Sequence, residues 1–244
     1  CLQMCPFKAL SVAGSNTETA LETVTLPHAP EVIDVPSVDS FRRPPRLSLA
    51  IRGVGGQGNL FFGKVLAQVA FLAGYDDRNI LKGETHGMAQ MGGPVISTFG
   101  CGEVFSPALV PGTANVLIAM EKAEVLRPGF LDLLEPGGTV LMADTRILPH
   151  GLKPEAYPSD EAIAAQLEGY RVVSVDVLSI ALNLGDPKGR CANVAMLGVL
   201  STLPPFDVVP ETVWLQALRG ISRKPALWDL NHAAFMAGRG MQKG

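Results

Sequence analysis

The sequence has 244 residues, of which 47% are apolar and 18% charged, so it can bury a large core as one domain, with or without an appendage. Its 20 basic and 23 acidic residues give a net charge of −3, which argues against a nucleic-acid or anionic-membrane surface as the main function. Its apolar runs fall well short of the ~20 residues of a membrane-spanning helix.

The N-terminus carries two cysteines at the spacing of an iron–sulfur motif. Cys1, Cys5 and Pro6 reproduce C-x3-C-P, the end of the bacterial ferredoxin run in which thiolates hold a [4Fe–4S] cluster. Two unrelated cysteines are the alternative. We expect residues 1–10 to be the end of a ferredoxin-type module and Cys1 the cut end of a longer chain. The four cysteines make no disulfide framework and favour a reducing, cytoplasmic compartment.

Residues 11–45 are predicted to form a proline-rich linker. This stretch has no sustained period of 3.6 or 2 and is rich in residues that break helices and strands. A compact domain is therefore expected over residues 46–244.

Strand and helix patterns alternate along this domain. Alternation and buried apolar runs predict strands at 46–54, 94–101, 115–120, 139–144 and 171–177. Helical spacing and stop signals predict helices at 57–73, 123–134, 160–168, 192–203, 210–220 and 225–238. The pattern favours an α/β fold: a Rossmann-like, mainly parallel sheet with helices on both faces and a helical C-terminal region.

The glycine turn after the first strand is the first candidate site. It fits G-x-G-x-x-G between a strand and a helix, where free N–H groups and the helix dipole can hold an anion. Its candidate cofactor-binding residues are Gly53, Gly55, Gly56, Gln57 and Gly58. The acid expected for a nicotinamide ribose would be Asp76 or Asp77, but neither ends a credible second strand. The alternative is that the glycines only permit a tight turn and close packing.

The second candidate is the aperiodic segment 82–94, which leads into a buried strand, as ligand-facing loops do. His86 is suited to acid/base or hydrogen-bonding chemistry, although a lone histidine is also commonly structural. The candidate binding residues here are His86, Gln90, Gly92 and Gly93.

The third candidate opens the helix predicted at 192–203. Arg190 and Asn193 are placed for anion or polar contact at its positive end, and capping explains Asn193 equally well. Cys191 is expected to be a buried packing thiol. Signatures of metallohydrolases, serine hydrolases and kinases are missing from the sequence, and we assign no catalytic residue.

Together these segments resemble a known family. The motifs GVGGQG, ETHGMAQMGGPV, EVFSP, NVLIAMEKAEVLR, LEPGGTVLMAD and ANVAMLG resemble the gamma-type domain of 2-oxoacid:ferredoxin oxidoreductases, and most of all its indolepyruvate type. The resemblance spans residues 46–240. Met91 departs from the basic or polar residue usual in the family, which puts the contacts of that loop in doubt.

The resemblance implies a role within a larger enzyme. Thiamine diphosphate and Mg²⁺ would be held by a thiamine-binding alpha subunit or fused domain, with coenzyme A as acyl acceptor. Electrons from the 2-oxo acid would leave through [4Fe–4S] clusters to ferredoxin. This chain would line the active-site cleft with its glycine turn and the HGMAQ loop, in a hetero-oligomer or a dimer of fused chains. A self-sufficient nucleotide-binding oxidoreductase and a scaffold or electron-transfer adaptor are the alternatives.

Overall fold

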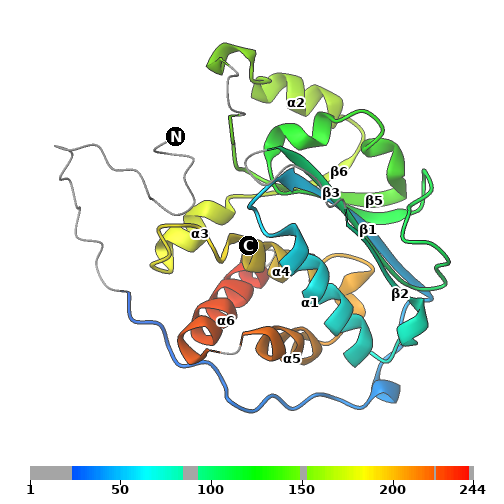
Figure 1. The fold of residues 1–244 in the computed structure, drawn as a ribbon, viewed down its shortest axis with the longest axis vertical. Helices are drawn as coiled ribbons and strands as arrows, with labels where there is room; N and C mark the ends of the chain where they lie inside the picture. Colours follow the sequence, from blue (N-terminus) through cyan, green and yellow to red (C-terminus); the bar gives the residue numbers. More distant parts are fainter. Residues whose placement is uncertain (1–23, 85–92, 149–152, 223, 242–244) are drawn as a thin grey trace.

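The computed structural model describes residues 24–84, 93–148, 153–222 and 224–241. Its centre is a six-stranded sheet in the order β2-β3-β1-β4-β5-β6 (Figure 1). The strands are β1 (Arg46–Val54), β2 (Ile80–Glu84), β3 (Pro94–Gly102), β4 (Ala114–Ala119), β5 (Leu134–Ala143) and β6 (Arg171–Val175). β1, β4, β5 and β6 pair in parallel, whereas β3 is antiparallel to both β1 and β2. The predicted α/β fold with a mainly parallel sheet is confirmed.

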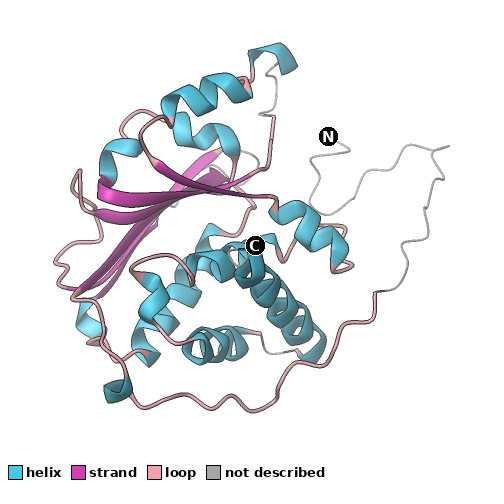
Figure 2. Cartoon of the chain, turned by 180° about the vertical axis from the view of Figure 1, so that it is seen from behind, coloured by secondary structure: helices cyan, strands magenta, loops and turns pink. Residues whose placement is uncertain are grey.

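Helices cover both faces of the sheet (Figure 2). They are α1 (Asn59–Leu72), α2 (Asp160–Gln166), α3 (Val177–Asn183), α4 (Ala192–Leu200), α5 (Glu211–Ile221) and α6 (Pro225–Gly240). α2 lies on one face, and α1 and α4–α6 lie on the other. Side chains of β4 pack into hydrophobic cores on both faces of the sheet. Val116 and Ile118 pack in the core of the larger helical layer, and Ala119 packs in the core beside α2. The strand is buried throughout, as expected for a parallel strand covered twice.

The helix predicted at 123–134 is wrong. Two short 3-10 segments, Lys122–Leu126 and Leu131–Leu133, stand there instead. Pro128 disfavours helical backbone in the residue before it, and Arg127 is extended at φ −65° and ψ 130°. Gly129 follows at φ 78° and turns the chain away. The strand predicted from residue 139 already begins at Leu134.

Two elements were not predicted. β2 has only two consecutive apolar residues, so its own sequence does not predict a strand. It joins the sheet by pairing with β3. α3 replaces the end of the strand predicted at 171–177, since the Asp176 side chain accepts a hydrogen bond from Ser179 N–H and caps a new helix.

Residues 24–45 form an extended strap along the helical layer (Figure 1). It holds one 3-10 turn, Val38–Ser40, and no other helix or strand. The Ala29 N–H donates to Asp229 at 2.8 Å, and the Trp228 indole N–H donates to the Pro30 carbonyl at 3.0 Å. This part of the predicted linker is therefore docked on α6. Residues 11–23 lie outside the described ranges.

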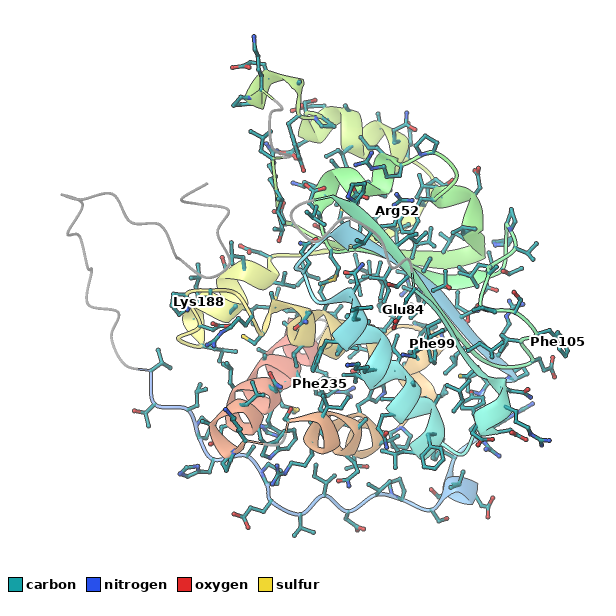
Figure 3. All side chains as sticks on the ribbon, in the orientation of Figure 1. Arg52, Glu84, Phe99, Phe105, Lys188 and Phe235 are labelled. Atoms are coloured by element: carbon teal, nitrogen blue, oxygen red, sulfur yellow. The ribbon has the colours of Figure 1, made fainter. Side chains whose placement is uncertain are left out.

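α4 and α6 cross through two glycines. A Cβ added at Gly198 would lie 2.1 Å from the Phe235 carbonyl oxygen, and one added at Gly238 would lie 2.0 Å from the Ala195 carbonyl oxygen. Real side chains do not approach backbone this closely, so the crossing requires glycine at both positions. Figure 3 shows Phe235 within this layer and Arg52 on the other side of the sheet. None of the helices in the described ranges is long and apolar enough to cross a membrane.

The crossing gives the first prediction. Gly198→Ala should lower the free energy of unfolding by at least about 2 kcal/mol, because the methyl group overpacks α4 against backbone that cannot yield. The matched control is Gly220→Ala on α5, where an added Cβ meets nothing within 4 Å, and where alanine should stabilise by up to about 1 kcal/mol. Urea unfolding of both variants measures this, and equal effects would contradict the close crossing.

Candidate functional site

The glycine turn lies between β1 and α1, as predicted, at the carboxyl end of the central strands. Gly56 and Gly58 adopt φ of 100° and 85°, which favour glycine. α1 begins at Asn59, so Gln57 and Gly58 belong to the turn, and no side chain caps the helix. The Gly55 N–H donates to the Gly93 carbonyl at 2.9 Å, which joins the turn to the start of β3.

The Gln57 side chain braces this turn. Its Oε1 accepts from the Val54 N–H at 2.7 Å, and its Nε2 donates to the Met120 carbonyl at 2.6 Å. The amide thus connects the turn to the residue that follows β4. The sequence predicts Gln57 as a candidate ligand contact, whereas in the structure its side chain holds the turn.

Asn193 packs directly on the turn. It is the second residue of α4 and is 8% exposed, and its Oδ1 has no hydrogen-bond partner. A Cβ at Gly58 would lie 2.3 Å from Asn193 Nδ2, so glycine is needed there to admit the amide. Since its Oδ1 accepts no hydrogen bond, Asn193 does not cap the helix, and the capping explanation is wrong.

A second buried amide, which sequence reasoning missed, borders the same turn. Asn59 is the first residue of α1 and is 6% exposed, and neither its Oδ1 nor its Nδ2 has a partner. Its Oδ1 lies 3.2 Å from the position that a Cβ of Gly53 would take. A buried polar group without a partner costs about 1–3 kcal/mol, so a ligand group that pairs with these amide atoms would gain free energy on binding. The only sequence signal was an asparagine at a helix start, which capping preferences explain without a ligand.

The two helix N-termini meet at this turn. α1 and α4 each bring the partial positive charge of their first N–H groups to the place where Asn59 and Asn193 lie. This arrangement can bind a polar group whose oxygen accepts hydrogen bonds from the N–H groups of the helix ends. The same group would need an N–H or O–H that donates to the side-chain oxygens of Asn59 and Asn193.

The Arg190 and Cys191 pair has a structural role. Arg190 Nε binds Asp186 Oδ1 at 3.0 Å, and the Cys191 N–H donates to Asp186 Oδ2 at 2.9 Å. Burial raises the pKa of the Cys191 thiol to about 12, and burial does the same for Cys101. Both thiols are therefore protonated packing groups, as expected for Cys191.

A buried carboxyl group follows β4 beside this turn. Glu121 is 2% exposed and accepts from the Glu124 N–H at 3.1 Å, from the Ile147 N–H at 3.3 Å and from the Tyr157 hydroxyl. Burial raises its pKa above the ordinary value. Glu124, itself 3% exposed, pairs with Arg52 at 3.2 Å on the neighbouring strand. Glu121 and Glu124 belong to the motif NVLIAMEKAEVLR, but the sequence alone does not predict these contacts.

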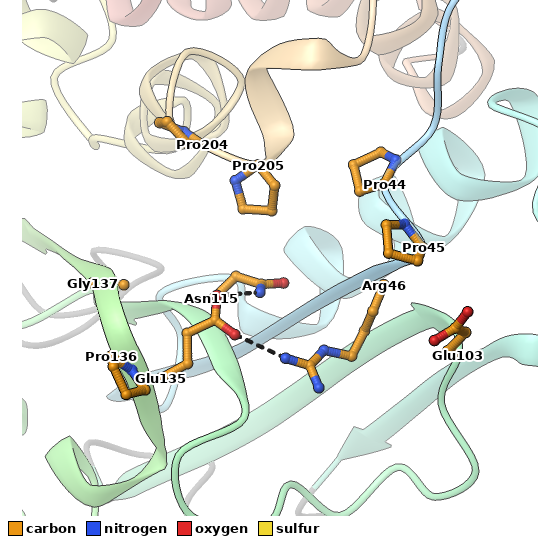
Figure 4. A pocket seen from close by; sticks show the side chains of 11 residues that line it. Pro44, Pro45, Arg46, Glu103, Asn115, Glu135, Pro136, Gly137, Pro204 and Pro205 are labelled. Atoms are coloured by element: carbon orange, nitrogen blue, oxygen red, sulfur yellow. Dashed lines mark hydrogen bonds and ion pairs between the residues drawn. The ribbon is translucent and has the colours of Figure 1, made fainter.

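A hollow of about 490 Å³ lies at the opposite end of the strands from the glycine turn (Figure 4). Arg46 pairs with Glu135 at 2.8 Å, and Asn115 Nδ2 donates to Glu135 Oε1 at 2.6 Å. The remaining wall is mainly proline: Pro44, Pro45, Pro136, Pro204 and Pro205. This hollow is on the amino ends of β1, β4 and β5, away from the glycine turn.

Comparison with known proteins decides the family. Residues 48–241 match the family described as pyruvate ferredoxin/flavodoxin oxidoreductase.

The chain belongs to this family.

Two similar proteins are named indolepyruvate oxidoreductase subunit IorB. The one from Archaeoglobus fulgidus is 35% identical over 159 residues, which cover 64% of this chain and 76% of that protein. The one from Thermococcus kodakarensis is 33% identical over 197 residues, covering 78% of this chain and 93% of that protein. The resemblance to 2-oxoacid:ferredoxin oxidoreductases is confirmed.

Solved structures show the same fold. Pyruvate oxidoreductase subunit PORC from Thermotoga maritima superposes with a TM-score of 0.60 at 20% identity, covering 81% of this chain and 97% of that one. A 2-oxoglutarate:ferredoxin oxidoreductase from Magnetococcus marinus also gives 0.60, at 18% identity, covering 82% of this chain and 32% of the other.

Several candidate residues of this family member lie outside the described ranges: Cys1, Cys5, His86, Gln90 and Gly92. Of the second candidate segment, Gly93 is described, and its carbonyl holds the glycine turn through Gly55. Within the described ranges, no group of three or more His, Cys, Asp and Glu side chains could hold a metal ion.

The brace formed by Gln57 gives the second prediction. Gln57→Ala should lower the free energy of unfolding by about 2 kcal/mol or more, because it leaves the Val54 N–H and the Met120 carbonyl unpaired. Gln68→Ala, on the exposed side of α1, is the control and should stay within about 0.5 kcal/mol of the unmodified chain. Denaturant unfolding measures both, and a neutral Gln57→Ala would show that the turn does not need this brace.

Glu121 gives a prediction of pH dependence. Because burial raises its pKa, the folded chain binds this proton more tightly than the unfolded chain does. Its contribution to stability is therefore fully present below pH 4.5, the ordinary pKa, and is lost as the pH rises through the raised pKa. Because glutamine does not titrate, we expect the free energy of unfolding of Glu121→Gln to lack this decrease with rising pH.

The measurement is the free energy of unfolding of both proteins from pH 4 to pH 8. The difference, original minus Glu121→Gln, should fall as the pH rises. A difference that grows with pH would mean that the carboxylate is stabilised in the fold and that the assigned direction of the pKa shift is wrong.

Proposed function

We propose that this chain is a subunit or fused domain of an indolepyruvate-type 2-oxoacid:ferredoxin oxidoreductase. The enzyme would oxidatively decarboxylate an aryl or other 2-oxo acid. The bond to the carboxylate would break and release CO₂, and the acyl carbon would form a thioester with coenzyme A as the thiol loses its proton to solvent. The two electrons would pass singly to ferredoxin. The match over residues 48–241 and the IorB relatives support this assignment.

The observation that carries the role of this chain is the polar turn between β1 and α1. Two helix N-termini and the buried amides of Asn59 and Asn193 meet there, with unpartnered atoms on both side chains. We propose that the turn lines the active-site cleft and contacts coenzyme A. The proposal extends to the backbone of the residues predicted from the sequence, Gly53, Gly55, Gly56, Gly58, Gly92 and Gly93, and to His86 and Gln90.

The resemblance implies that a partner of this chain holds thiamine diphosphate and Mg²⁺. Within the described ranges, no group of three or more His, Cys, Asp and Glu side chains is placed to hold a metal ion. We assign this cofactor to the thiamine-binding alpha subunit or fused domain. Ligation of a [4Fe–4S] cluster by Cys1 and Cys5 is part of the proposal and is supported by their spacing alone. A reducing cytoplasmic location and ferredoxin as acceptor follow from the same assignment.

The structure disfavours the self-sufficient nucleotide-binding alternative. Asp76 precedes β2 and so does not end a second strand, and its carboxylate is bound by Arg78 at 2.6 Å. Dinucleotide folds place a free acid at the end of that strand for the ribose hydroxyl.

The test is anaerobic reconstitution with the thiamine-binding partner and viologen as electron acceptor. We expect viologen reduction to require indolepyruvate, coenzyme A and this chain, with acyl-CoA as product. Equal reduction without this chain would contradict the proposal. Tight NADH binding by the isolated chain, measured by calorimetry, would favour the nucleotide-binding alternative instead.

A further inference from the structure

The unpartnered amides of Asn59 and Asn193 select among the ligand groups that could reach the turn. Both side chains are more than nine-tenths buried, and they border the turn from two different helices. Asn59 leaves a donor and an acceptor unpaired, and Asn193 leaves an acceptor unpaired. A complementary ligand must therefore bring N–H or O–H donors as well as an oxygen acceptor.

Anions meet only part of this requirement. A phosphate or carboxylate group would accept from Asn59 Nδ2 and from the N–H groups at the start of α1. It would also bring lone pairs against the two carbonyl oxygens, which need donors. An indole ring offers one N–H and no acceptor, so it would leave Asn59 Nδ2 unpaired.

A secondary amide offers both groups in one plane. Its N–H can donate to an asparagine Oδ1 while its carbonyl accepts from Asn59 Nδ2 or from the α1 helix end. Glycine at positions 53 and 58 keeps Cβ atoms away from this polar surface, since a Cβ there would press on the Asn59 and Asn193 amides.

We infer that Asn59 and Asn193 form a binding site for a neutral secondary amide of the acyl-carrying thiol, in its arm between the sulfur and the phosphates. This rests on the proposed function, in which coenzyme A is the acyl acceptor and carries such amides. The pair sets the position of the thiol arm and acts in binding, with no part in bond breaking.

The experiment compares Asn59→Leu with Asn115→Leu in the assembled complex. Leucine resembles asparagine in shape but cannot hydrogen-bond. Asn115 is as buried as Asn59, at 6% exposed, but its amide is bonded to the Ser48 N–H and to Glu135. We expect Asn59→Leu to raise the KM for coenzyme A roughly tenfold with little change in kcat, and to leave the melting temperature unchanged or higher. Asn115→Leu should lower the melting temperature and leave the KM unchanged.

Two competitors locate the contact on the ligand. Pantetheine carries the neutral amide arm, and adenosine 3′,5′-bisphosphate carries the anionic end. Asn59→Leu should weaken inhibition by pantetheine and leave inhibition by the bisphosphate unchanged. The inference is overturned if the KM does not change, if the bisphosphate is the competitor that weakens, or if Asn59→Leu is destabilised like Asn115→Leu.

A second variant keeps the test decisive. If Asn59→Leu does not assemble, Asn193→Leu changes the same site from α4 and should give the same KM and competition pattern. If the unmodified complex forms no acyl-CoA, the proposed function itself fails. If it forms acyl-CoA and neither variant alters the KM, only the amide site fails.

Discussion

The side-chain amide of Gln57 holds the part of the molecule on which the candidate site depends. It binds the Val54 N–H at the end of β1 and the Met120 carbonyl after β4, and these two strands are the central pair of the sheet. The brace fixes where α1 starts and therefore where Asn59 lies. Gly53 and Gly58 complete the arrangement, because a Cβ at either would collide with Gln57 or Asn193. The turn therefore connects β1 to β4, sets the start of α1, and positions the side-chain amides of Asn59 and Asn193.

The fold was predictable where local pattern and tertiary packing agree. β1, the glycine turn and α1 follow from alternation, glycine spacing and helical period, and β4 follows from an apolar run that is buried on both faces. Prediction failed where one residue overrides the period, as Pro128 does between the 3-10 segments of 122–133. It also failed for β2, whose short apolar pattern becomes a strand only beside β3. The strap over 24–45 shows that a proline-rich stretch can dock, since Asp229 and Trp228 bind its backbone.

The site was only partly predictable, because its decisive property is a relation between distant residues. The glycine motif located the turn, and position alone suggested Asn193, but Gln57 proved to be a brace. Asn59 was missed because an asparagine at a helix start has an ordinary local explanation. Its unusual state, buried with both amide atoms unpaired, depends on how α1 packs in the finished fold. α4 in turn reaches the turn through its close crossing with α6 at Gly198.

The central claim is that the turn between β1 and α1 is a ligand-binding surface and not packing alone. Hydrogen–deuterium exchange of the assembled complex, with and without coenzyme A, tests it most directly. We predict slower exchange at the backbone amides of residues 58–61 and at Asn193 when coenzyme A is present, with the strap over 24–45 unchanged. Exchange that stays the same at the turn while slowing elsewhere in this chain would contradict the claim.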